Sequence, residues 1–304
     1  MQIGDYRVEI IPDTEFRLDG GAMFGVVPRV VWERVSPADG QNRIRMNMNC
    51  VFVDTGKDKV LIETGIGEKW SAKQIDMYGI FREKPLAETL FEKTGCHTTE
   101  ITIVVNTHLH FDHAGGNTAL SESGGIAFGI DRDNARMTIP QFPNARYLVS
   151  ASELQHAENP HERDRASYLV ENWQPLRETG QLEAMPDDYE VVPGLRMQTI
   201  RGHSETMQTW RLDRGRKTMY GFADLIPTRH HVPLPWIMGY DLYPTETLAF
   251  KKKVLPKAVQ ENWLCLFYHD LHEPLSRIKE RDGKLLAVPV NTLEPSDLPR
   301  STKP

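Results

Sequence analysis

The chain has 304 residues, of which 39% are hydrophobic, so it is long enough to bury a large core. It carries 36 basic and 42 acidic residues, a net charge of -6, and no basic block, which argues against a nucleic-acid partner. The amino terminus lacks a signal-peptide pattern, no apolar run is long enough to cross a membrane, and the three cysteines have neither disulfide-framework nor zinc-ligand spacing. We therefore expect a cytoplasmic protein with no nucleic-acid and no membrane partner.

The first third of the chain alternates short apolar runs with turn residues. Strands are expected at 6–11, 43–53 and 59–63, and residues 54–58 between the last two are a hairpin signal. A polar and aromatic loop is expected at 68–84. A helix is predicted from Pro85 to Thr94, where Gly95 ends it, and a buried strand at 101–105 follows.

The rest of the chain continues with strands and helices in alternation. Residues 121–146 are glycine-rich and irregular, which is typical of a functional or mobile loop. A capping box from Ser150 to Glu153 opens one helix, and a helix from Thr245 is expected to be interrupted near Pro256, with Lys251 to Lys253 on its solvated face. The remaining predicted elements are a short helix from 114, a helix at 160–179, strands at 147–149, 195–199, 209–212, 217–222 and 263–268, a hairpin turning at 282–283, and a flexible tail at 295–304.

The most informative stretch is Asn106 to Asn117, which follows the predicted strand at 101–105. His108 and His110 alternate with Leu109, so in an extended segment their imidazoles point to the same side, as two ligands of one metal must. Asp112 and His113 are adjacent and point in different directions, which suits a second metal. Burying this polar cluster without a metal would cost several kcal/mol per group. Gly115 and Gly116 then let the backbone turn sharply and approach its neighbours closely.

Three further predicted strands also end in residues that bind metals. They lead to His203, Asp224 and His269. Strands of an open sheet build one site where their carboxyl ends meet, so all of these side chains are expected to converge.

The motif His108-x-His110-x-Asp112-His113 resembles that of the metallo-β-lactamase-fold hydrolases. The order of the ligand-bearing strands matches as well, so the resemblance covers nearly the whole chain, from Met1 to Val290. It implies an α/β architecture, the αββα sandwich of two mixed β-sheets flanked by helices, with each half of the chain contributing one sheet. We expect a single domain of residues 1–294.

The same resemblance implies two divalent metal ions. One would be held by His108, His110 and His203, and the other by Asp112, His113 and His269, with Asp224 bridging. Zinc is the default for such a nitrogen and oxygen donor set, while manganese, iron and cobalt stay open. A hydroxide bridging the metals would be the nucleophile, and Asp112 could carry its proton to the leaving group, so Asp112 and Asp224 are the expected catalytic residues.

Within the superfamily, three segments resemble the branch of quorum-quenching lactonases and methyl-parathion-type hydrolases: 20–25, 142–145 and 235–241. Aromatic residues in the surrounding loops suit an apolar substrate. The expected substrate-binding residues are Met23, Phe24, Trp70, Phe81, His230 and Trp236. The sequence departs from the family at Pro227, where lactonases commonly have tyrosine, at Ser204 to Thr206, and at Glu63, where aspartate is usual. Glu63 is expected to hold the loop under the metals by hydrogen bonds.

These observations favour a dinuclear metal hydrolase that opens lactones of the acyl-homoserine-lactone type or cleaves apolar esters. A phosphotriesterase is the near alternative, because the same hydroxide can attack phosphorus. A non-catalytic, metal-stabilised binding or sensor protein is the third. The loop residues Val26, Val27, Val30, Val31 and Trp32 suit a homodimer interface and the core equally well.

Overall fold

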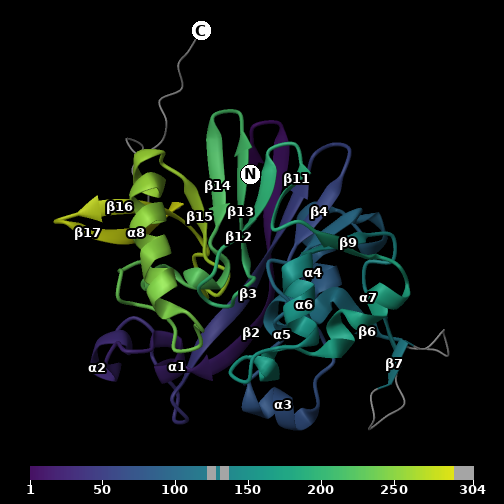
Figure 1. Cartoon of the computed structure of the whole chain (residues 1–304), viewed down its shortest axis with the longest axis horizontal. Coiled ribbons are helices and arrows are strands. Elements are labelled where there is room, and N and C mark those ends of the chain that lie inside the picture. Colours follow the sequence, from purple (N-terminus) through teal and green to yellow (C-terminus); the bar gives the residue numbers. More distant parts are fainter. Residues whose placement is uncertain (122–127, 131–136, 291–304) are drawn as a thin grey trace.

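The computed structural model describes residues 1–121, 128–130 and 137–290. Within them the chain forms two facing β-sheets with helices on the outside, and Figure 1 shows α8 on one side of the strands and α4, α6 and α7 on the other. The predicted tail at 295–304 and part of the predicted loop at 121–146 lie outside the described residues.

The two main sheets come from successive halves of the chain, as predicted. In the described residues each has seven strands, ordered β1-β2-β3-β4-β5-β9-β10 and β11-β12-β13-β14-β15-β16-β17, and a smaller sheet is ordered β6-β8-β7. The first sheet contains β1 (Gln2–Ile3), β2 (Tyr6–Asp19), β3 (Arg43–Asp54), β4 (Lys59–Ile62), β5 (Ile103–Val105), β9 (Arg146–Ser150) and β10 (Leu182–Met185). The second contains β11 (Asp188–Val192), β12 (Leu195–Thr199), β13 (Gln208–Arg214), β14 (Lys217–Gly221), β15 (Leu264–Leu266), β16 (Leu275–Arg281) and β17 (Lys284–Pro289), and the smaller sheet is β6 (Thr118–Leu120), β7 (Phe128–Ile130) and β8 (Met137–Pro140).

The helices connect and cover these strands. The α-helices are α1 (Gly20–Phe24), α2 (Arg29–Trp32), α3 (Ala72–Met77), α4 (Leu86–Thr94), α5 (Phe111–Ala114), α6 (Ala151–Glu158), α7 (Gln174–Glu178) and α8 (Pro244–Gln260). Short 3-10 turns lie at η1 (Thr98–Glu100), η2 (Gly115–Asn117), η3 (Arg165–Ser167), η4 (Val170–Asn172), η5 (Ala223–Leu225) and η6 (Arg229–His231).

Strand direction brings the functional loops to one edge of the molecule. β4, β5, β9 and β10 run parallel, and β14 and β15 are a parallel pair in the second sheet. Parallel neighbours end on the same side, so the segments that follow β5, β14 and β15 emerge together. The main core lies between the sheets and includes Val51, Val53 and Ile62 from the first and Met197 and Trp210 from the second.

Most predicted elements are confirmed, including the hairpin β3–β4 and helix α4, where Gly95 adopts φ 78° as a left-handed cap. The predicted helix at 160–179 is wrong. Only α7 is α-helical there, and the preceding segment is extended at Tyr168, which forms a β-bridge with His110. The predicted loop at 68–84 contains α3, which has a capping box of Ser71 and Gln74.

Helix α8 corrects two expectations. It continues through Pro256 without interruption. Lys251, predicted to be solvated, is fully buried, whereas Lys252 and Lys253 are exposed. A proline inside a helix removes one backbone hydrogen bond, and packing of the buried side chains Val254, Leu255 and Ala258 around it offsets that loss.

The valine-rich segment near the amino terminus divides between core and surface. Val27 and Trp32 are buried, while Val26 and Val30 are 86% and 71% exposed. The exposed valines are compatible with a homodimer interface, which stays a prediction. In the part of the chain that the structure describes, no helix has the length and apolar character needed to cross a membrane.

Candidate metal centre

The segment after β5 supplies four of the candidate ligands. His108 and His110 lie in the turn that follows the strand, and α5 begins directly after His110, so that Asp112 and His113 project from a new helical turn. The glycines after α5 permit this path: a Cβ on Gly115 would lie 2.2 Å from the Ile66 carbonyl oxygen. The predicted close approach of the backbone is therefore present.

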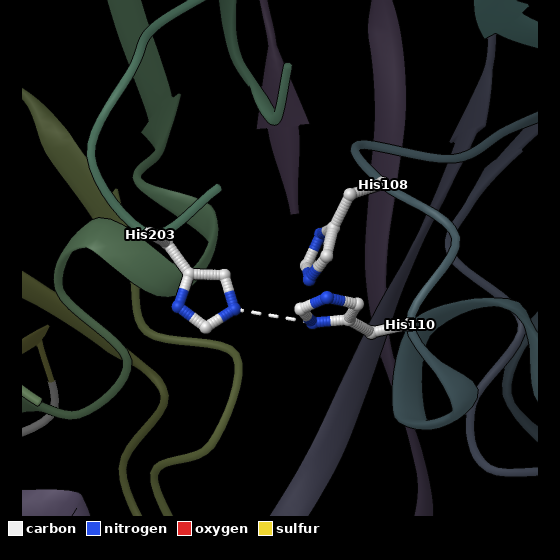
Figure 2. Close-up of side chains that lie close together, drawn as sticks. All are labelled: His108, His110 and His203. Atoms are coloured by element: carbon white, nitrogen blue, oxygen red, sulfur yellow. Dashed lines mark hydrogen bonds between the residues drawn. The ribbon is translucent and has the colours of Figure 1, made fainter. Parts of the chain in front are cut away.

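The second half of the chain supplies the other three. His203 follows β12, Asp224 lies in η5 after β14, and His269 follows β15. All seven residues are buried, none being more than 6% exposed. Figure 2 shows His108 and His110, from one segment, and His203, from another, turned toward one another.

These side chains form two adjoining groups. Within each group, the atoms that could bind a metal all lie within 4.8 Å of one another. One group is His108, His110 and His203, and the other is Asp112, His113, Asp224 and His269. Asp224 joins them: its Oδ1 is 3.1 Å from Nε2 of both His113 and His269, and its Oδ2 is 3.6 Å from Nε2 of His203. The two groups contain the residues of the two ligand sets that the family resemblance implies, and their binding of metals stays a prediction.

The donor atoms suit divalent metal ions. Nε2 of His108 and Nε2 of His110 are buried and have no hydrogen-bond partner among the residues that the structure describes, and Nδ1 of His110 lies 3.1 Å from Nε2 of His203. Burial, followed by the neighbouring histidines, lowers the pKa of His108 well below its ordinary value, so the ring is neutral, which is the form that binds metals. Several imidazole nitrogens facing one buried point are costly unless a cation lies between them.

The carboxylate of Asp224 is held in its charged form. Burial alone would raise its pKa, but His269 and His113 hold the pKa well below the ordinary value. Burial would lower the pKa of His113, but the carboxylates of Asp224, Glu63 and Asp112 raise it well above its ordinary value. The group thus favours positive charge beside Asp224, and a divalent ion would supply that charge in place of ring protons.

Each imidazole in the second group, and His203 in the first, has a partner behind it. Nδ1 of His113 lies 3.2 Å from Oε1 of Glu63, Nδ1 of His203 lies 3.1 Å from Oδ1 of Asp241, and Nδ1 of His269 lies 3.1 Å from the Asn47 carbonyl oxygen. Such partners fix the ring orientation and leave Nε2 for a metal. Asp241 was a residue that sequence reasoning did not single out.

Glu63 holds the loop as predicted and does more. Its carboxylate accepts hydrogen bonds from the Thr107 amide at 3.1 Å and the Asn106 side chain at 3.3 Å, besides facing His113. Its side chain is fully buried, and its backbone adopts φ 64°. The usual aspartate position is therefore occupied by a longer carboxylate that reaches a candidate ligand.

Glu153 is a second buried carboxylate that supports the ligand segment. Its amide bonds to the Ser150 hydroxyl as a helix cap, but its side chain does not complete the predicted capping box. It accepts instead from the Leu109 amide at 2.8 Å, from the Tyr168 hydroxyl at 3.0 Å and from the Thr206 hydroxyl. The residue thus fixes the backbone between His108 and His110.

The predicted substrate-binding residues are dispersed. Met23 and Phe24 are buried in the core, where Phe24 stacks on His231 at 4.7 Å and meets the half-buried Trp236 edge-on at 5.6 Å. Their buried side chains offer no open surface to a substrate. Phe81 is 66% exposed and lines a cavity of about 470 Å³ with Glu15 and Arg45, and His230 lines one of about 280 Å³ beside His269.

Trp70 packs against the residue that precedes the candidate ligand Asp112. Its ring is 5.4 Å from Phe111, which precedes Asp112, and 5.5 Å from Tyr78. The sequence assigns no role to Tyr78, which lies in the aromatic loop predicted at 68–84.

Lys251 holds the segment 231–236, which leads to Asp241, by hydrogen bonds. Its Nζ donates to the carbonyl oxygens of His231 at 2.6 Å, Pro233 at 2.8 Å and Trp236 at 2.9 Å. An ammonium group buried among three acceptors is satisfied without a carboxylate partner. The only sequence signal was its place within a helix, where Lys251 and its two neighbours look alike.

The chain is similar in sequence to several known proteins. A family model described as the metallo-beta-lactamase superfamily matches residues 44–195, half of the chain. The chain is 23% identical to an N-acyl homoserine lactonase of Bacillus cereus over 252 residues, 76% of this chain and 84% of that protein. It is also 23% identical to the N-acyl homoserine lactonase AiiA of Bacillus thuringiensis subsp. kurstaki over 247 residues, 75% of this chain and 82% of that protein.

Two solved structures share the architecture. A probable metal-dependent hydrolase from Staphylococcus aureus has a TM-score of 0.83 at 27% identity, covering 97% of this chain and 100% of that chain. AidC, described as a dizinc quorum-quenching lactonase in complex with a product, has a TM-score of 0.75 at 19% identity, covering 97% of both chains. At 19% identity, the similarity to AidC shows a shared fold only.

Proposed function

This chain belongs to the metallo-beta-lactamase superfamily, because the family model matches half of its residues. We propose that it is a dinuclear metal-dependent hydrolase that opens lactones of the acyl-homoserine-lactone type. The observation that carries the proposal is the pair of adjoining histidine and aspartate groups joined by Asp224. The N-acyl homoserine lactonases among its relatives support the choice of substrate.

The proposed ligands follow the two groups. His108, His110 and His203 would hold one ion, Asp112, His113 and His269 the other, and Asp224 would contact both. Two divalent ions bound there would supply Lewis acidity, polarising a carbonyl oxygen and lowering the pKa of a water molecule to about 7. Zinc suits the all nitrogen and oxygen donor set, and manganese, iron and cobalt are tested beside it.

The chain's own residues have distinct tasks in this reaction. Asp112, with Oδ2 3.5 Å from Nε2 of His269, would take a proton from the attacking water and deliver it to the alkoxide that leaves when the ring opens. Asp224 would keep the two groups at a fixed separation. Trp70 and Phe111 would cover the apolar part of the substrate and exclude water.

The test combines metal analysis with an activity assay on one metal-loaded sample. We expect two metal ions per chain and turnover of N-hexanoyl homoserine lactone. In an Asp224→Ala, His269→Ala double variant, metal content and turnover should both fall, whereas His97→Ala, at an exposed site, should change neither. Lactone turnover that persists unchanged in the double variant would refute the proposal.

The same sample separates the other functions. Two bound metals with turnover of paraoxon-like esters but not of lactones would indicate a phosphotriesterase. Two bound metals without hydrolysis of lactones, esters or phosphotriesters would indicate a binding or sensor protein. Fewer than one metal per chain after loading would mean that the ligand assignment itself is wrong.

A further inference from the structure

A cavity of about 320 Å³ lies between helix α8 and strands β12, β13 and β14 of the second sheet (Figure 1). Its lining contains none of the seven candidate metal ligands. The volume is at the lower end of the range of about 300–1,000 Å³ that is typical of small-molecule sites. The cavity is therefore separate from the candidate metal centre, and its size suits a small ligand.

The buried part of the lining is mostly aromatic and apolar. It consists of Met197, Trp210, Tyr220, Val254 and Trp263, with the half-buried Phe250 beside them. The rings of Tyr220 and Trp263 are stacked, with their centroids 5.0 Å apart. The Tyr220 hydroxyl shares a hydrogen bond of 2.8 Å with Thr209, and the Trp210 indole donates to the Tyr268 hydroxyl at 2.7 Å. Because these polar atoms are bonded within the protein, the rings offer a ligand fixed apolar surface.

The charged part of the lining is mainly positive. Four cationic side chains and one carboxylate line the cavity: Arg196, Arg211, Lys253, Lys257 and Asp188. Two of the cations lie over the Trp263 ring, with the Arg211 guanidinium 4.7 Å and the Lys257 ammonium 5.8 Å from its centroid. Positive groups thus stand directly beside the aromatic surface.

Carboxylates compensate three of the four cations. The ion pairs are Arg196–Asp188 at 3.1 Å, Arg211–Asp213 at 2.6 Å and Lys257–Glu261 at 3.8 Å. Lys253 is exposed and has no ion pair with any residue that the structure describes. One positive charge is therefore uncompensated next to the apolar lining, and a ligand with a single negative charge would balance it.

We propose that this cavity binds a small monocarboxylate with an apolar chain, of the size of a medium-chain fatty acid. The carboxylate would meet Lys253, and the chain would cover the buried aromatic side chains Trp210 and Trp263. A neutral apolar molecule would leave the lysine without a partner. A polyanion such as a nucleotide would find three of the four cations already paired. The proposal does not depend on the reaction at the candidate metal centre.

Octanoate is the probe, and acetate and 1-octanol are its controls, because acetate lacks the chain and 1-octanol lacks the charge. Isothermal titration calorimetry on the metal-loaded protein should show octanoate bound at a single site in each chain. 1-Octanol should bind about fivefold more weakly, and acetate should show no measurable binding. Octanoate should also change the tryptophan fluorescence, since Trp210 and Trp263 line the cavity, and added salt should weaken its binding.

Two double variants locate the bound octanoate. Lys253→Gln, Lys257→Gln removes two positive charges from the cavity and should weaken octanoate binding about fivefold without changing metal content. Lys252→Gln, Lys284→Gln is the matched control. It removes the same charge at exposed positions outside the lining and should bind octanoate like the wild type.

The Asp224→Ala, His269→Ala variant tests whether octanoate binds to the metals instead, and we expect it to bind octanoate as tightly as the wild type. Loss of binding in that variant, with unchanged binding in Lys253→Gln, Lys257→Gln, would overturn the proposal. Absence of octanoate binding to the wild type would do the same. Equal weakening in the two lysine variants would also overturn it, because the effect would then come from the net charge of the protein.

Discussion

Glu63 combines an unfavourable backbone conformation with a fully bonded carboxylate. A side-chain-bearing residue at φ 64° costs about 1 kcal/mol or more, and such a conformation persists only where surrounding contacts enforce it. Here the contacts come from the Thr107 amide, Asn106 and His113. The residue therefore links the turn after β4 to the ligand segment after β5, and its negative charge increases the basicity of the His113 ring.

Glu63→Gln should keep the shape of this link and remove its charge. We expect the affinity for the second metal to fall by about 10- to 100-fold, because the partner behind a metal-binding histidine typically contributes that much. Competition with a calibrated chelator measures the affinity. Glu68→Gln, an exposed change a few residues away, should leave the metal affinity unaltered. If the two variants have equal metal affinity, Glu63 does not support metal binding.

His156 gives the chain a pH-dependent contribution to stability. Its hydrogen bond to Asp164, 2.8 Å long, raises the pKa of His156, while burial opposes the shift. Because the folded state holds this proton more tightly than the unfolded state, the stabilisation is complete below the unfolded pKa of about 6.5 and is lost as pH rises through the folded pKa.

The free energy of unfolding should therefore fall more on His156→Gln substitution at pH about 5.5 than at pH about 8.5. Urea denaturation at both pH values measures the difference. His161→Gln, at an exposed site nearby, is the control. A loss that is the same at both pH values would mean that the proton is not shared in the folded protein.

The identity of the candidate ligands was predictable at the residue scale, whereas their supports were not. His108 to His113 are close in sequence and have a recognisable spacing, and His203, Asp224 and His269 each follow a recognisable strand. Glu153, Asp241 and Lys251 act through contacts with residues far away in the chain. Nothing in their local pattern distinguishes them from surface residues of the same type.

At the scale of elements, local periodicity succeeded where neighbours in sequence are also neighbours in space. The hairpins and α4 are of this kind. The helix prediction failed at residues 160–173 for the opposite reason. There the chain is not α-helical, because Tyr168 pairs with His110 in a β-bridge and donates a hydrogen bond to Glu153. A long-range contact overrode a local preference there, as it did at Pro256 in α8.

Helix α8 stabilises the segment 231–236 through a single side chain. Lys251→Met should destabilise the protein by about 3 kcal/mol, because three carbonyl groups, one buried and two partly buried, lose their shared donor. It should also raise KM, since the same segment carries Trp236 and leads to Tyr240 and Asp241. Denaturation and steady-state kinetics measure these effects.

Lys252→Met is the matched control for that change, being one residue away and exposed. It should alter stability by no more than about 0.5 kcal/mol. If the two variants behave alike, the three hydrogen bonds of Lys251 do not hold the segment in solution. A Lys251 variant with lower stability but unchanged KM would limit its role to the helix.

At the scale of the whole molecule, the candidate metal centre joins the two sheets. The first sheet's half contributes His108, His110, Asp112 and His113, and the second contributes the rest. Metals bound to the folded state alone would add their binding free energy to the stability of the sandwich. Metal removal should accordingly weaken the contact between halves as well as abolish activity.

Treatment with a strong chelator should lower Tm by about 5 °C, the shift expected when some 3 kcal/mol of linked binding energy is lost from a chain of this size. Differential scanning calorimetry before and after chelation measures it, and restoring the metal should reverse the change. The Asp224→Ala, His269→Ala variant should show almost no shift. An unchanged wild-type Tm would mean that the sandwich does not depend on metals.

The division of the centre between two halves also has a consequence for synthesis on the ribosome. His108 to His113 emerge early, but each ligand group lacks a member until His203, Asp224 and His269 have been translated. During that interval the nascent first sheet has no partner for its apolar inner face, which carries Val51, Val53 and Ile62. Both candidate ligand sets are therefore complete only late in synthesis, and until then the first sheet exposes an apolar face of the kind that promotes aggregation.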